Sequence, residues 1–107
     1  MLIGQTILVA EDEPLLRLDL TAALVDLGAT VWPVADAREA LRLAAAPDLT
    51  GAILDYNLGA NTSVLVGWRL HRCGVPFLFL HRPHRSARLT VAHHSRHPQA
   101  LADDPDR

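Results

Sequence analysis

The stretch that decides the fold is TILVAEDEP, residues 6–14. Residues 6–10 are apolar or β-branched throughout, which is typical of a strand that is buried on both faces in a parallel sheet. Three acidic residues end the strand, and Pro14 favours a helix that begins at once, capped by Asp12 or Glu13, because a proline in the first helical turn gives up no hydrogen bond. A strand followed directly by a helix is the repeating unit of α/β proteins.

The same alternation continues to residue 80. Short apolar runs predict three further strands, and helical spacing of apolar residues predicts three helices between the strands. The predicted strands are residues 29–34, 51–55 and 77–80. The first helix begins at Pro14 and ends at Gly28, the second begins at Asp36 and ends before Pro47, and the third begins at Ser63 and ends at Gly74. One face of the first helix is expected to comprise Leu16, Leu20, Ala23, Leu24 and Leu27. Asp36 and Glu39 have the spacing of a capping box. Four strands alternating with three helices predict a parallel sheet with helices on both faces.

Length and composition limit the class of protein. A chain of 107 residues that is 50% hydrophobic is the size of one packed domain. Its formal charge of −2 argues against binding nucleic acid or an anionic membrane over the whole surface. A single cysteine, Cys73, cannot form an intramolecular disulfide, and no apolar stretch reaches the length of a membrane span. We therefore expect a soluble, cytoplasmic protein.

The composition changes after residue 80. Residues 1–80 hold 9 acidic residues against 5 arginines, whereas residues 81–107 hold 5 arginines, 5 histidines and 3 aspartates with few large apolar side chains. The second segment can bury too little apolar surface to offset the entropy lost on ordering, so we expect a mobile or weakly docked tail. Two origins stay open: an ordinary divergent tail, or a reading frame that shifted just past Leu80. Within residues 81–107, the stretch that could form a fifth strand is residues 88–92.

Three carboxylates are expected at one edge of the sheet. Glu11 and Asp12 follow the first strand and Asp55 ends the third, and the carboxyl ends of parallel strands meet at the edge where α/β proteins bind ligands. Clustered carboxylates repel one another, so such a site usually holds a cation, and oxygen ligands suit Mg²⁺. The alternative is that these acids are merely solvated beside a helix start and a strand end.

These motifs resemble the receiver domain of two-component response regulators over about residues 5–80. Residues 7–14 are similar to its first strand and acidic pair, residues 53–59 to its phosphoacceptor strand and loop, and residues 75–80 to its fourth strand. The resemblance implies a flavodoxin-like open sheet of strand order 2-1-3-4. It also implies that Asp55 accepts a phosphoryl group from a sensor histidine kinase or phosphotransfer protein. Mg²⁺ would be held by Glu11, Asp12, Asp55 and the backbone carbonyl of Asn57.

The chain departs from the family in the part of the site that senses the phosphoryl group. The family has Thr or Ser after the fourth strand, where this chain has His81, and a Lys after the fifth, whereas this chain contains no lysine. Two functions therefore stay open. One is a single-domain receiver in a phosphorelay, with no DNA-binding output domain. The other is a degenerate receiver-like interaction module that no longer switches.

Three further possibilities rest on weaker patterns. The histidines of residues 81–97 could supply ligands to Zn²⁺ or Ni²⁺, but no nearby cysteine supports such a site and a solvated basic tail is the better explanation. A flavin carrier on the same fold would need a phosphate-binding loop where Glu11 to Glu13 stand. A sheet that ended at residues 77–80 would leave an apolar edge, which predicts a homodimer unless the tail covers that edge.

Overall fold

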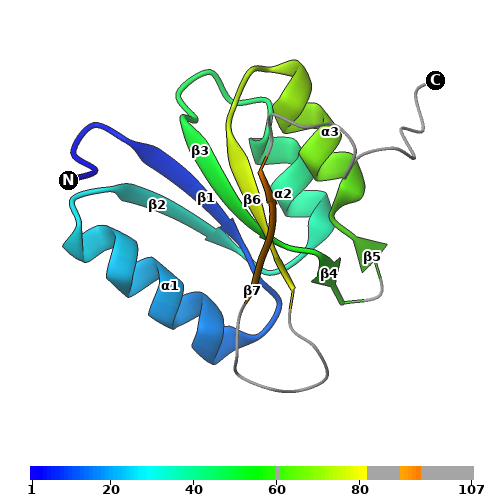
Figure 1. The fold of residues 1–107 in the computed structure, drawn as a ribbon, viewed down its shortest axis with the longest axis horizontal. Helices are drawn as coiled ribbons and strands as arrows, with labels where there is room; N and C mark the ends of the chain where they lie inside the picture. The colour runs from blue at the N-terminus through cyan, green and yellow to red at the C-terminus, as the bar shows by residue number, and fades with distance from the viewer. Residues whose placement is uncertain (60, 82–89, 95–107) are drawn as a thin grey trace.

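The computed structural model describes residues 1–59, 61–81 and 90–94. The elements in these ranges are β1 (Thr6–Ala10), α1 (Pro14–Asp26), β2 (Thr30–Val34), α2 (Ala37–Leu43), β3 (Gly51–Asp55), β4 (Asn57–Leu58), β5 (Asn61–Thr62), α3 (Val64–Arg72), β6 (Phe77–His81) and β7 (Thr90–His94). The main sheet has the strand order β2-β1-β3-β6-β7 (Figure 1). Its first four strands are parallel, so the predicted flavodoxin-like α/β sheet and its order 2-1-3-4 are confirmed.

The fifth strand of the sheet, β7, runs antiparallel to β6. A parallel neighbour would need a crossover of a dozen or more residues, and only eight residues, 82–89, separate β6 from β7. The stretch predicted at 88–92 thus forms a strand at 90–94 that pairs with β6 as a return strand. Strand β7 thus pairs with the edge of β6, and the homodimer through a sheet edge stays a prediction. Of the tail predicted to be mobile or weakly docked, residues 81–107, only His81 and residues 90–94 are described, and the rest lies outside the described residues.

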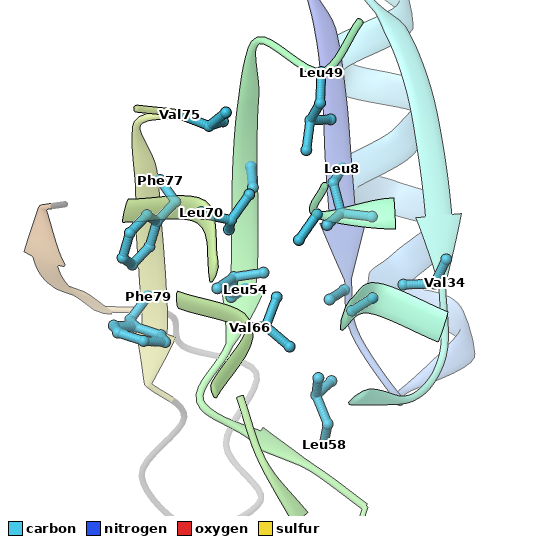
Figure 2. Close-up of a cluster of buried hydrophobic side chains, with 14 residues drawn as sticks. Leu8, Val34, Leu49, Leu54, Leu58, Val66, Leu70, Val75, Phe77 and Phe79 are labelled. Atoms are coloured by element: carbon cyan, nitrogen blue, oxygen red, sulfur yellow. The ribbon is translucent and has the colours of Figure 1, made fainter. Parts of the chain in front are cut away.

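The hydrophobic core lies between the sheet and the pair of helices α2 and α3 (Figure 2). Leu8, Leu54, Phe77 and Phe79 point from alternate positions of three strands toward this side, and each is 2% exposed or less. The helices contribute small or branched side chains, Ala40, Ala44, Val66 and Leu70. Helix α1 packs on the opposite face, against β1 and β2 (Figure 1). The core face of the sheet is thus covered by α2 and α3, whereas α1 covers the opposite face at β1 and β2.

Local signals explain most of the element boundaries. The Glu13 side chain caps α1 by accepting from the Leu16 N–H at 2.9 Å, and Asp36 caps α2 by accepting from the Glu39 N–H at 2.8 Å, as predicted from the capping-box spacing. Gly28, with φ +102°, follows α1 in a left-handed conformation that suits glycine.

Two details differ from the predictions. No residue of α1 is buried: on the predicted apolar face Leu16, Leu20 and Leu24 are half-buried, Ala23 is exposed, and Leu27 is the C-cap residue and 48% exposed. Between β3 and α3, where no strand is predicted, Asn57–Leu58 and Asn61–Thr62 form a short antiparallel pair, β4 and β5. No helix in the described ranges is both long and apolar enough to cross a membrane.

Candidate functional site

Three carboxylates meet at the carboxyl edge of the parallel strands. Glu11 directly follows β1 and Asp55 ends β3, and these are neighbouring strands in the sheet. One carboxylate oxygen from each of Glu11, Asp12 and Asp55 lies within 4.8 Å of the others. Glu11 is fully buried, Asp55 is 2% exposed and Asp12 is half-buried. The expected meeting of these three side chains is thus present, whereas their roles stay predictions.

Backbone hydrogen bonds hold the two acids that follow β1. Glu11 accepts the Glu13 N–H on Oε2 at 3.0 Å, and its own carbonyl accepts from Nη1 of Arg17 at 2.8 Å. Asp12 accepts the Gly59 N–H on Oδ2 at 2.9 Å, across 47 residues of sequence. The bond from Gly59 ties the turn after β4 to the acidic cluster. Each of these two carboxylates therefore accepts a hydrogen bond from the backbone, which helps to orient it.

The end of β3 is held by a buried serine that sequence reasoning treated only as a helix start. The Ser63 hydroxyl donates to the carbonyl of Asp55 at 2.8 Å and to that of Tyr56 at 3.3 Å, and Ser63 is fully buried. The Tyr56 N–H donates to the Leu80 carbonyl at 3.1 Å, which links β3 to β6. The sequence indicated Ser63 only as the start of α3, because its hydrogen bond to the Asp55 carbonyl depends on how the chain folds.

The remaining predicted site residues lie around the cluster. Asn57 is exposed and begins β4, two residues after Asp55. His81 is the exposed last residue of β6, and its imidazole stacks on the Tyr56 ring with centroids 5.0 Å apart and an interplanar angle of 20°. His81 does not belong to the group of converging carboxylates. Sequence reasoning placed His81 at this edge but did not anticipate its stack on Tyr56.

The alternative histidine site cannot be located in the same way. His84 and His97 lie outside the described residues, and His93 and His94 belong to β7. Cys73, the C-cap residue of α3, is an exposed free thiol. The acidic cluster is therefore the candidate metal centre among the described residues.

The donor chemistry of the cluster fits a hard divalent cation. Three carboxylates at this separation repel one another, and burial of Glu11 and Asp55 removes the water that would otherwise weaken the repulsion. A bound cation would offset that repulsion. Because every converging ligand atom is a carboxylate oxygen, the set suits Mg²⁺ better than a metal that prefers sulfur or imidazole ligands.

Comparisons with known proteins support the fold. No family profile and no curated protein matches the sequence. Among solved structures, a fusion that contains the yeast Spc42 trimeric coiled coil matches with a TM-score of 0.69 and 20% identity, over 80% of this chain and 59% of that one. A cysteine-to-serine mutant of RitR matches with a TM-score of 0.57 and 29% identity, over 64% of this chain and 30% of that one. The chain thus spans less than two thirds of each structure.

Proposed function

We propose that the chain is a receiver domain that accepts a phosphoryl group on Asp55. The observation that carries this proposal is the buried cluster of three carboxylates at the carboxyl edge of a flavodoxin-like sheet. A purely structural role does not explain why two buried acids and a third are gathered at one point, because each added charge destabilises the fold. The order of the motifs along the sequence, which resembles that of receiver domains, supports the same function.

The reaction is a phosphoryl transfer from one nucleophile to another. A carboxylate oxygen of Asp55 attacks the phosphorus of a phosphohistidine on a sensor kinase or phosphotransfer protein. An O–P bond forms to Asp55, the P–N bond breaks, and the electron pair stays on the imidazole nitrogen of the donor. The product is an acyl phosphate. No general base is needed, because an ionised carboxylate is already a nucleophile.

The negative charge of the acids around Asp55 suggests that they bind a cation. Glu11, Asp12, Asp55 and the backbone carbonyl of Asn57 would hold Mg²⁺, which when bound neutralises charge on the reacting phosphoryl oxygens. Ser63 fixes the backbone of Asp55, so its carboxylate stays at the meeting point of the cluster. The bond from Gly59 to Asp12 keeps the turn after β4 beside the same point.

A second function follows from the residues that differ from the receiver pattern. His81 stands where the family has Thr or Ser, and the chain has no lysine to pair with a phosphate. A degenerate module with this fold would bind a protein partner without a phosphorylation switch. The two functions differ in whether Asp55 reacts.

Intact-mass spectrometry after treatment with acetyl phosphate and Mg²⁺ tests the proposal. We expect a single phosphoryl adduct on the wild type. No adduct should form when EDTA is present during the reaction, or on the Asp55→Asn variant. The matched control is Asp19→Asn, an exposed aspartate on α1, which should react like the wild type. A folded wild-type protein without an adduct would favour the degenerate module. An adduct that persists in Asp55→Asn would place the chemistry on another residue.

A further inference from the structure

Helix α1 carries apolar side chains on two opposite sides. The side that packs on the sheet carries three half-buried leucines, Leu16, Leu20 and Leu24. The outer side carries a second row at spacings of three and four residues, here called the outer row: Leu15, Leu18, Ala22 and Val25. All four are exposed, Leu15 by 70% and Leu18 by 63%. A helix that is apolar on both sides is typical of a helix packed between two layers, and the sheet of this chain supplies only one of them.

The strands beside α1 present a second apolar area. Val9, Ile53 and Leu78 are register partners across β1, β3 and β6, and their neighbours along each strand point into the core, so this row faces the α1 side. Val9 is fully buried, whereas Ile53 and Leu78 are half-buried. The reason is that α1 packs on β1 and β2, while α2 and α3 pack on the core face (Figure 1). No helix of the described residues therefore covers β3 and β6 on this side.

A second copy of the chain has the shape to cover both areas at once. Rotation of one copy by 180° about an axis parallel to the strands, at the level of α1, reverses the strand order β2-β1-β3-β6. Strands β3 and β6 of each copy then lie opposite β1 and β2 of the other. The two α1 helices lie side by side in one layer, about 10 Å thick, between two sheets. Each outer row meets the uncovered strands of the other copy, so the contact is reciprocal, as twofold symmetry requires.

The chemistry of the two areas suits contact with each other. Apart from Asp55 at the end of β3, the strand residues that face the α1 side on β1, β3 and β6 are apolar or glycine: Ile7, Val9, Gly51, Ile53, Leu78 and Leu80. The sheet side of the contact therefore buries little charge. On α1, the exposed Asp19 and Asp26 lie beside the outer row, so twofold symmetry brings like charges into one interface. Apolar burial then drives association, and salt should strengthen it by screening the acids.

The area of the contact predicts a reversible dimer. Helix α1 has 13 residues, and the uncovered strands β3 and β6 have 5 each. The helix face measures about 20 Å by 10 Å and the two strands about 17 Å by 10 Å. Each copy thus loses about 200 Å² of footprint on each area, about 400 Å² in all, which is about half of what one partner buries in a standard interface.

We infer that two copies of the chain form a twofold dimer in which the outer row of each α1 packs on strands β3 and β6 of the other copy. This dimer differs from the edge-to-edge homodimer expected from the sequence, because no strand of one copy pairs with a strand of the other. It does not depend on whether Asp55 accepts a phosphoryl group.

Sedimentation velocity from micromolar to submillimolar concentration measures the dissociation constant of the dimer. Leu18→Glu places a charge in the outer row and should weaken the dimer by about tenfold or more, because the substitution acts twice in a twofold interface. The matched control is Leu65→Glu, at a 41% exposed leucine of α3 on the other side of the sheet, which should leave the dissociation constant unchanged. Both leucines are exposed in the monomer, and circular dichroism checks that both variants fold.

Mixing two variants tests that the helix of one copy meets the sheet of the other. Leu18→Glu alters the helix side and Leu78→Lys the sheet side, so each variant alone carries a charge in both halves of its homodimer. In a mixed dimer, one half is unaltered and the other half joins opposite charges. We therefore expect the mixed dimer to be tighter than either variant's homodimer. A contact between two helices or between two strand edges predicts no such recovery.

The single cysteine reports the arrangement of the two copies. Cys73 is an exposed thiol at the end of α3 and takes a spin label without any substitution. In the inferred dimer the two α3 helices lie on opposite outer faces, four layer spacings of about 10 Å apart, so the distance between the labels should be roughly 40 Å.

Four results would overturn the inference. The first is a wild type that stays monomeric over the whole concentration range. The second is a Leu18→Glu variant that dimerises as tightly as the wild type, or a Leu65→Glu variant that is weakened equally. The third is a dimer that dissociates as salt is raised, since ion pairs would then hold it. The fourth is a distance between the labels below about 30 Å, which would place both α3 helices on the same side of the dimer.

Discussion

Asp55→Asn is predicted to stabilise the folded protein when no divalent cation is present. Asp55 lies within 4.8 Å of a carboxylate oxygen of Glu11 and of Asp12. At this separation two unit charges repel by about 1 kcal/mol in water and by about 3.5 kcal/mol at the effective dielectric constant of partly buried pairs. Asparagine is nearly the same size and removes one charge from two such pairs. Favourable contacts of the carboxylate are lost as well, so we expect a net gain of about 1–3 kcal/mol.

Urea unfolding followed by tryptophan fluorescence measures this gain. Trp32 on β2 and Trp68 on α3 pack against the core and report on its loss. In EDTA the midpoint of Asp55→Asn should lie above that of the wild type. Saturating Mg²⁺ should stabilise the wild type by more than it stabilises the variant. A ligand stabilises the folded state in proportion to its affinity for that state, and the variant has lost one charged ligand. Asp19→Asn should leave the unfolding free energy within about 0.5 kcal/mol of the wild type under both conditions.

Two results would refute the electrostatic reasoning. One is a loss of stability for Asp55→Asn in EDTA, which would mean that the carboxylate makes a net favourable contribution to the fold. The other is an equal Mg²⁺ effect on wild type and variant, which would mean that the cation does not bind at the cluster. Either result would remove the argument that the three acids are gathered for a cation.

Two further predictions concern the residues that shape the site and the sheet. Ser63→Ala removes the hydroxyl that donates to the Asp55 and Tyr56 carbonyls, so the free energy of urea unfolding should fall by about 1–3 kcal/mol. The control Thr62→Ala, at an exposed position, should change this free energy by less than about 0.5 kcal/mol. Equal effects of the two substitutions would contradict a positioning role for the Ser63 hydroxyl. Gly28→Ala should lower the midpoint of thermal unfolding by more than Gly74→Ala does. Both glycines have positive φ, but a Cβ at Gly28 would also lie 2.8 Å from Cγ1 of Ile3. The opposite order of the two midpoints would contradict this steric argument.

The parts of the fold that depend on local pattern were predictable from the sequence. The apolar runs at residues 6–10 and 51–55 form neighbouring parallel strands that are largely buried, as continuous apolar runs predict. The cap of α2 follows from the spacing of Asp36 and Glu39. The meeting of Glu11 and Asp55 follows from the rule that the carboxyl ends of parallel strands share one edge.

The features that the sequence did not predict depend on contacts between distant residues or on weak local signals. The stack of Tyr56 on His81 joins side chains 25 positions apart, through the register of β3 and β6. The β4–β5 pair is only two residues long on each strand, and its asparagines are typical of turns. The direction of β7 depends on the short connection after β6, which apolar content alone does not reveal.

Chemical trapping of the phosphorylated residue tests the central claim most directly. The protein is treated with acetyl phosphate and Mg²⁺, reduced with borohydride, and digested for peptide mass spectrometry. Borohydride converts an aspartyl phosphate to homoserine, so the account predicts homoserine at position 55 in the wild type, only when Mg²⁺ was present. Homoserine at another aspartate, or an unchanged Asp55 in a protein that is folded and supplied with Mg²⁺, would contradict it.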